Sequence, residues 1–184
     1  MASEVEVTIT GIVRGKTFVV PYSHHQGLQF VVVGGVRTER PVIYEVPYYE
    51  VRVGRGGTYA AVRFGLQNNG SVPKIRHCDA GLSHAHHCTP SWIPTYSPHS
   101  FRGGSRPGAW QLLPGKGFLI HEGADTRKDQ VGGSLGCVEI LDGRWNYFLA
   151  EIERLAGAPV AAISASHKLQ VSIESAHYPI ASLV

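Results

Sequence analysis

The N-terminal third of the chain restricts the fold most, because each of its patterned segments has the period of a β-strand. Residues 4–13 alternate at period two and place Val5, Val7 and Ile9 on one face, as a strand with one buried side requires. Further segments rich in Val, Ile, Tyr and Phe end at Gly or Pro, at residues 17–22, 28–35, 41–54 and 58–70. With 22 glycines and 11 prolines, the chain is predicted to be turn-rich and mainly β, a β-rich α+β fold.

One later segment, residues 141–159, has the pattern of a helix. Five large apolar residues recur there at helical spacing and predict a buried stripe: Trp145, Phe148, Leu149, Ile152 and Leu155. Asp142 is the predicted N-cap, and Gly157 followed by Pro159 is the predicted stop. The alternation over residues 169–173 predicts a late strand.

The length of 184 residues favours a single domain, with an N-terminal β section at about 1–67 and the remainder at about 68–184. Residues 68–116 show almost no periodicity before the segment AWQLL. A loop of this length in a compact domain is usually functional or disordered. Its aromatic residues argue against disorder, so we expect an ordered wall beside a site.

Composition excludes some classes of protein. No run of about 20 apolar residues occurs, so no transmembrane helix is expected. The net charge of +3 comes without a run of Lys and Arg, so no nucleic-acid interface is expected. The first residues, MASEVEVTITGIVRG, lack the pattern of a signal peptide. The protein then works in the cytosol, is trimmed, or is exported by another route.

The three cysteines leave several states open. Cys78 and Cys88 are separated by nine residues and could close a small disulfide loop, which leaves Cys137 without a partner. The same segment holds six residues that can bind zinc: His77, Cys78, His84, His86, His87 and Cys88. Their spacing matches no standard zinc finger. If zinc bound there with an open position, a metal-dependent hydrolase would follow. Reduced, packed thiols are the remaining alternative.

The segment GFLIHEGADTRKDQVGGSLGCVEI, residues 117–140, carries the residues best suited to chemistry. A strand ends at His121, and a polar loop leads through glycines to Cys137, so the two residues can face each other from neighbouring strands. A cysteine nucleophile needs a base, a group that orients the base, and N–H donors for the oxyanion. The backbone carbonyl of Glu122 can orient the imidazole, and glycines allow the N–H groups to turn. A structural histidine and a buried thiol are the alternative.

The segment contains His121, then a polar loop, then Ser134-x-Gly136-Cys137 and a hydrophobic residue. In this order of residues it resembles the signature of the L,D-transpeptidase catalytic domain, the YkuD-like family. The resemblance covers about residues 108–142. Leu135 stands where the family usually has a second histidine. Divergent members, including effectors of type VI secretion, relax that histidine, and the chain resembles a divergent member of this kind. Glu139 stands where many members carry arginine or asparagine.

The resemblance implies a YkuD-like mixed β-sheet or sandwich with one main helix and a long active-site loop. It implies a cysteine-dependent transpeptidase or carboxypeptidase that acts on peptidoglycan stem tetrapeptides in the periplasm or cell wall, without a cofactor. Cys137 would be the nucleophile and His121 the base, while the Glu122 carbonyl, Ser134 and the backbone at Gly136 would assist. If the enzyme is a toxin, an immunity protein would be a partner.

Substrate contacts are expected from residues around this segment: Gly133, Leu135, Arg127, Trp110 and Tyr96. Arg127, Arg144 and Arg102 are candidates for binding substrate carboxylates, as replacements for the arginine that the family carries near the cysteine.

Two other functions stay open. A papain-like peptidoglycan peptidase of the NlpC/P60 type would place its cysteine at a helix N-terminus and pair Cys137 with His167 or His177. A β-rich binding module would use the aromatic loop as its surface and the Cys/His segment as a structural site.

Overall fold

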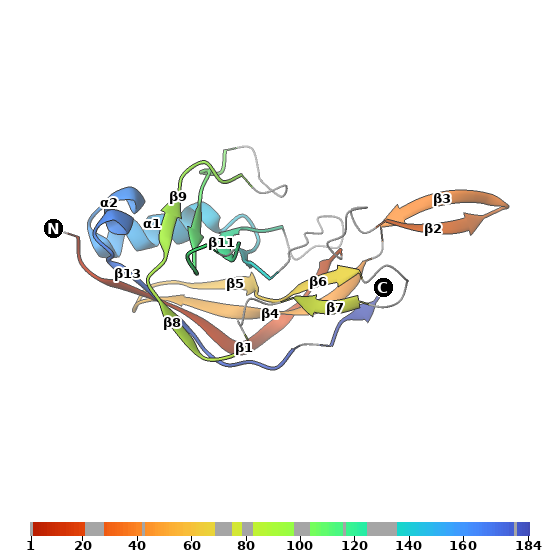
Figure 1. Cartoon of the computed structure of the whole chain (residues 1–184), viewed down its shortest axis with the longest axis horizontal. Helices are drawn as coiled ribbons and strands as arrows, with labels where there is room; N and C mark the ends of the chain where they lie inside the picture. The colour runs from red at the N-terminus through yellow and green to blue at the C-terminus, as the bar shows by residue number, and fades with distance from the viewer. Residues whose placement is uncertain are drawn as a thin grey trace.

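The computed structural model describes residues 2–20, 28–41, 43–68, 75–78, 83–97, 104–115, 117–124, 136–178 and 180–184. Within this part a curled, mixed β-sheet dominates, and one main helix packs on it (Figure 1). The prediction of a mainly β fold with one main helix is therefore confirmed. The sheet has ten strands, nine of them in the order β8-β13-β1-β4-β5-β12-β11-β10-β9, with β14 paired to β4.

One half of the sheet is built on the long first strand. The strands of this half are β1 (Val5–Val19), β4 (Tyr44–Val53), β5 (Thr58–Val62), β8 (His86–Cys88), β13 (Leu169–Ile173) and β14 (Ser182–Leu183). β1 runs parallel to β13 and antiparallel to β4. β13 is the late strand predicted from alternation, and its Leu169, Val171 and Ile173 are buried in the core.

The other half contains short strands: β9 (Ser91–Ile93), β10 (Ala109–Gln111), β11 (Leu119–Glu122) and β12 (Val138–Ile140). Two separate two-stranded sheets complete the β structure, β2 (Leu28–Val33) with β3 (Val36–Pro41) and β6 (Gly65–Asn68) with β7 (Ile75–Cys78). The β2–β3 hairpin extends from the end of the molecule opposite the helices (Figure 1).

The first strand is longer than its pattern indicates. Residues 4–13 and 17–22 look like separate strands in the sequence, but β1 continues through both, with register shifts between Ile9 and Gly15 where it pairs with β4. A Cβ atom at Gly11 would lie 2.7 Å from the carbonyl oxygen of Ser175. Glycine at this position lets the two backbones approach while the strand bends.

The segment expected to be a wall loop contains regular structure in its described parts. β7, β8, β9 and β10 all fall within residues 68–116, and β8 and β9 form the two ends of the main sheet. We expected an ordered wall loop, and the described parts are ordered but include these short strands. Strands of three residues are too short to show alternation, and pairing with a neighbouring strand stabilises them instead.

The main helix, α1 (Trp145–Ala156), covers one face of the sheet and is followed by the shorter α2 (Val160–Ala165). Trp145, Phe148, Leu149 and Ile152 are buried in the core, as predicted, and Leu155 packs against it. Gly157 ends the helix in the left-handed conformation, with φ of 67°. The predicted N-cap was wrong. Asp142 adopts φ of 58° in the preceding turn, and Arg144 is the cap.

Residues 104–108 are attached to the start of α1 by polar contacts. The Arg106 guanidinium donates two hydrogen bonds to the Glu153 carboxylate, at 2.7 and 2.8 Å. The Trp145 indole donates a hydrogen bond to the carbonyl of Arg106, and the backbone N–H of Arg106 donates one to the side-chain oxygen of Asn146. These contacts place Ser105 beside the end of β11, where its hydroxyl donates to the Glu122 carboxylate at 2.5 Å.

Replacing Phe148 by alanine tests whether the α1 stripe carries the fold. Phe148 is fully buried and contacts Tyr59 and Trp145, so F148A should lower the free energy of unfolding by about 3–5 kcal/mol. Tyr147, the next residue, is 61% exposed, and Y147A should change it by less than about 0.5 kcal/mol. Urea unfolding measures both, and equal effects would contradict this assignment of the core.

Candidate functional site

The site depends on the pairing of β11 with β12. These strands are parallel, and the register sets Ile120 opposite Val138 and His121 opposite Glu139. Side chains alternate between the faces of a sheet, so Ile120 and Val138 point to the helix-covered core. His121 and Glu139 therefore point to the other face, and Cys137, two residues before Glu139, is placed there too.

This arrangement modifies the sequence-based expectation. The two strands do lie side by side, but they run parallel, whereas the strands of a hairpin run antiparallel. His121 and Cys137 share a face, but they are not direct cross-strand neighbours. The residue directly opposite His121 is Glu139, which the sequence marks only as a departure from a family pattern.

The imidazole of His121 is held by the backbone. Its Nδ1 atom lies 2.6 Å from the carbonyl oxygen of Glu122, the contact that the sequence predicted. A carbonyl oxygen can only accept a hydrogen bond, so Nδ1 carries the proton in the neutral ring. Nε2 is then the nitrogen that can accept a proton. His121 is 4% exposed, and the ring of Tyr96 lies 5.2 Å from it, centroid to centroid.

Cys137 is a reduced thiol in an apolar environment. It belongs to a small cluster with Ala109 and Leu119, and Ile93 and Tyr96 pack against that cluster. Its Sγ atom lies 3.5 Å from the carbonyl oxygen of Gly117. Burial raises the pKa of the Cys137 thiol to about 11. A hydrogen bond from the Leu119 backbone opposes this rise, and the Glu139 carboxylate adds to it. The resting thiol is therefore neutral.

Glu139 is a carboxylic acid enclosed by the sheet. It is 3% exposed, and burial raises its pKa from 4.5 to about 7. Within the described residues, none donates a hydrogen bond to its carboxyl group. A Cβ atom added to Gly123 would lie 2.6 Å from the Cβ atom of Glu139, so the glycine after Glu122 is needed for this packing. Strongly shifted carboxyl groups of this kind are enriched at functional sites.

Glu122 contributes to the site through its backbone. Its side chain is buried and accepts the hydrogen bond from Ser105. This contact fixes the end of β11, and with it the carbonyl that holds His121. The sequence does not reveal the role of Ser105, because 17 residues separate it from Glu122 and no local pattern joins them.

The two aromatic residues expected to bind substrate lie in different environments. Tyr96 is at the site, beside His121 and the cluster that contains Cys137. Trp110 is fully buried in the main core, where its ring packs against Trp92. Trp110 pairs with Ile120 in the register of β10 and β11, so it points to the helix-covered face. Its expected contact with substrate is therefore replaced by a packing role.

Gly136 adopts a φ of 114° directly before Cys137, a conformation that favours glycine. The chain therefore turns at the position where the sequence predicts an N–H donor. The remaining expected site residues, Arg127, Gly133, Ser134 and Leu135, lie outside the described residues, as does Arg102. Arg144 is engaged at the start of α1, where its guanidinium lies over the rings of Tyr147 and Tyr59.

The Cys/His segment forms no disulfide at Cys88, which is a reduced, half-buried thiol on β8. The disulfide with Cys78, one of the alternatives that the sequence leaves open, is therefore absent. Burial raises the pKa of the Cys88 thiol to about 11. Among the residues that the structure describes, no three His, Cys, Asp or Glu side chains are grouped as ligands for a metal ion. The side chains of His77 and Cys78 lie outside that description.

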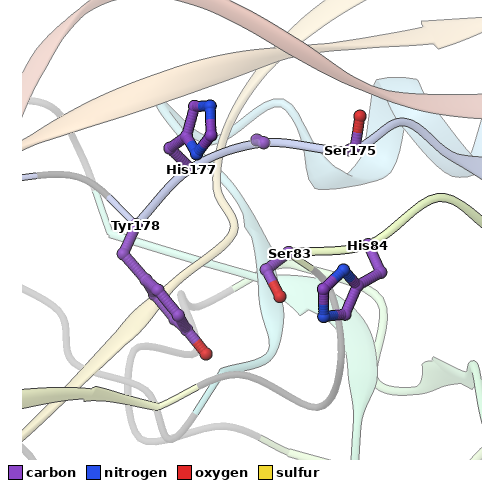
Figure 2. A pocket seen from close by; sticks show the side chains of 6 residues that line it. Ser83, His84, Ser175, His177 and Tyr178 are labelled. Atoms are coloured by element: carbon purple, nitrogen blue, oxygen red, sulfur yellow. The ribbon is translucent and has the colours of Figure 1, made fainter.

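A cavity of about 440 Å³ lies elsewhere, between the segment before β8 and the segment after β13. Its lining consists of Ser83, His84, Ser175, Ala176, His177 and Tyr178. Figure 2 shows the imidazoles of His84 and His177 pointing in different directions. None of the lining residues that the structure describes is a cysteine or carries a carboxylate, so these residues offer neither a thiol nucleophile nor a buried acid. The face that carries His121, Cys137 and Glu139 is the better candidate site.

Comparison with known proteins gave no match to a protein-family model, to a curated protein or to a solved structure. Within the described part of the chain, neither helix has the length and apolar character needed to cross a bilayer.

Glu139→Gln tests the buried acid through the pH dependence of stability. The unfolded carboxyl loses its proton near pH 4.5, while the folded one keeps it to about pH 7. The folded state binds more protons between these values, so wild-type stability falls as pH rises through this window. Glutamine cannot ionise. At pH 8 the variant should therefore be more stable than wild type by up to about 3 kcal/mol.

Urea unfolding of both proteins at pH 4, 6 and 8 measures this effect. The pH 4 comparison is the internal control, since both side chains are neutral there and the ionisation penalty vanishes. A difference in the free energy of unfolding that stays constant with pH would contradict the buried, shifted acid.

Proposed function

We propose that the protein is an L,D-transpeptidase-like enzyme that uses Cys137 to form a thioester with peptidoglycan stem tetrapeptides. The observation that carries the proposal is the hydrogen bond from His121 Nδ1 to the Glu122 carbonyl, at 2.6 Å. It directs Nε2 to act as the base on the face that carries Cys137. The order and spacing of His121, Gly136 and Cys137 support the same chemistry through their resemblance to the family signature.

The neutral thiol determines how the reaction begins. Because the pKa of Cys137 is about 11, little thiolate exists at neutral pH, and the thiol proton must move as the sulfur attacks. Cys137 Sγ attacks the carbonyl between diaminopimelate and the terminal D-alanine, while His121 Nε2 accepts the proton. The imidazolium then protonates the leaving amine of D-alanine, and a thioester to Cys137 remains.

The backbone near Gly136 and Cys137 is suited to stabilise the tetrahedral intermediate. Gly136 turns the chain with its φ of 114°, which allows N–H groups to approach the oxyanion. Each such donor contributes about 3–4 kcal/mol in comparable sites. The thioester then passes to an amine, in cross-linking or exchange, or to water, in carboxypeptidase action. Tyr96 beside His121 is placed to contact the stem peptide.

The same proposal covers the setting. The substrate places the reaction in the periplasm or cell wall. The resemblance to type VI effectors makes an antibacterial toxin, neutralised by an immunity protein, the expected biological role. The papain-like alternative requires the cysteine at a helix N-terminus, whereas Cys137 directly precedes the strand β12, which disfavours it.

Incubation with disaccharide tetrapeptide from a diaminopimelate-type cell wall tests the reaction. Wild type should release D-alanine and form tripeptide or cross-linked dimer, as followed by mass spectrometry. Cys137→Ala should lower the rate at least about a thousandfold, because it removes the nucleophile. Cys88→Ala is the matched control, since Cys88 is also a reduced and partly buried thiol, and its rate should stay near that of wild type.

Two histidine variants identify the base. His121→Gln should lower the rate strongly, whereas His177→Gln, at the separate cavity, should leave it near wild type. Loss of activity in H177Q with retention in H121Q would favour the papain-like peptidase. An unchanged substrate with wild type, at equal folding, would leave the β-rich binding module as the better reading.

A further inference from the structure

The carboxyl group of Glu139 has no part in the steps above, yet it lies beside both reacting groups. It is directly opposite His121 in the parallel ladder, and it lies two residues after Cys137 on the same face of the sheet. Its carboxylate acts electrostatically on the Cys137 thiol. Within the described part of the chain no hydrogen-bond partner reaches this carboxyl group, and few carboxylic acids are so deeply buried without one, since the charged form then loses its hydration.

Among the described residues, no lysine or arginine side chain forms an ion pair with Glu139. β11 presents His121, whose Nδ1–H is bound to the Glu122 carbonyl. β5 presents the apolar Val62 opposite Glu139. Tyr96 contributes a neutral phenol, which contacts His121. α1 lies on the other face, where the Glu122 side chain is bound by Ser105.

A charge on Glu139 therefore acts strongly on its neighbours. The carboxyl is 3% and Cys137 9% exposed, so water screens their interaction little. Loss of the thiol proton next to an ionised carboxylate brings two negative charges together on one face of the sheet. With the carboxyl protonated, only the thiolate and the imidazolium form, and these two charges attract each other.

We propose that Glu139 is a positioning residue that restrains the Cys137 nucleophile through its charge. When Glu139 is protonated, the S–H bond of Cys137 breaks and the proton moves to His121 Nε2, which leaves a thiolate and an imidazolium. When Glu139 is ionised, its charge opposes the thiolate and Cys137 reacts more slowly. The restraint therefore weakens as the pH falls and Glu139 takes up its proton. This inference rests on the proposed role of Cys137 as a nucleophile.

Alkylation of Cys137 by iodoacetamide between pH 5.5 and 9 tests the inference without any peptidoglycan substrate. Peptide mass spectrometry measures the rate at Cys137 separately from Cys78 and Cys88. The ratio of the Glu139→Gln rate to the wild-type rate should be about one at pH 5.5, where both side chains are neutral. It should rise to about two- to tenfold above pH 8, the effect of a thiol pKa lowered by up to about one unit.

Two variants are the controls. Glu139→Asp keeps the carboxyl group and should follow the pH profile of wild type. Glu50→Gln removes another buried carboxylate, on β4, which is bonded to Arg14 of β1 and Arg52 of β4. β5 separates β4 from β12. The ratio of the Glu50→Gln rate to the wild-type rate should stay near one at every pH. Thermal unfolding of each variant at pH 5.5 checks that the proteins are folded where alkylation rates are compared.

Two results would overturn the inference. A Glu139→Gln ratio that does not change with pH would show an effect of packing alone. A ratio below one above pH 8 would show that the carboxylate supports the thiolate through His121. Alkylation measures the reactivity of the thiol directly, so its result is independent of tetrapeptide cleavage. If the inference alone is wrong, cleavage persists and the alkylation ratio does not rise with pH. If the proposed function alone is wrong, cleavage is absent and the alkylation ratio still rises above pH 8.

Discussion

The parallel pairing of β11 with β12 in the middle of the sheet is the constraint on which the candidate site depends. β10 pairs with β11 on one side and β5 with β12 on the other, so backbone hydrogen bonds fix both strands. The register then determines which side chains share a face. One face supplies Ile120 and Val138 to the main core. The other face receives His121, Glu139 and Cys137, which are titratable groups in a position that usually holds apolar residues.

Burial of these three groups determines their chemistry. Each can be charged, and each is less than one-tenth exposed, so a charge on one changes the proton affinity of the others. The raised pKa values of Cys137 and Glu139 have the same first cause, the loss of hydration. In the proposed reaction the proton of the thiol is therefore transferred within the site. The Glu122 carbonyl would support this transfer, because it fixes the tautomer of His121.

Local patterns predict much of the architecture. Alternation identifies the first part of β1 and β13, composition identifies β4, and helical spacing identifies the buried face of α1. The hydrogen bond from His121 to the Glu122 carbonyl is also predictable, since it joins adjacent residues and depends only on a turn after the strand. The left-handed end of α1 at Gly157 follows from residue type alone.

The remaining features depend on contacts distant in sequence. β8 and β9 have three residues each and are strands because they pair with β13 and β10. The sequence gives the number of residues between β11 and β12, but this number does not determine whether the two strands run parallel. The place of Glu139 opposite His121 depends on that direction and therefore could not be predicted. One signal for Glu139 is present in the sequence, because a residue two positions after Cys137 in a strand must share its face. The core position of Trp110 follows from its register with Ile120.

The most direct test of the proposed chemistry is to observe the covalent intermediate. Wild-type protein is mixed briefly with a diaminopimelate-type disaccharide tetrapeptide, quenched in acid, and analysed by intact-protein and peptide mass spectrometry. A thioester of the substrate, less D-alanine, on the peptide that contains Cys137 is the predicted result. An adduct on Cys78 or Cys88 instead would contradict Cys137 as the nucleophile. So would a Cys137→Ala protein that forms product as fast as wild type without any adduct.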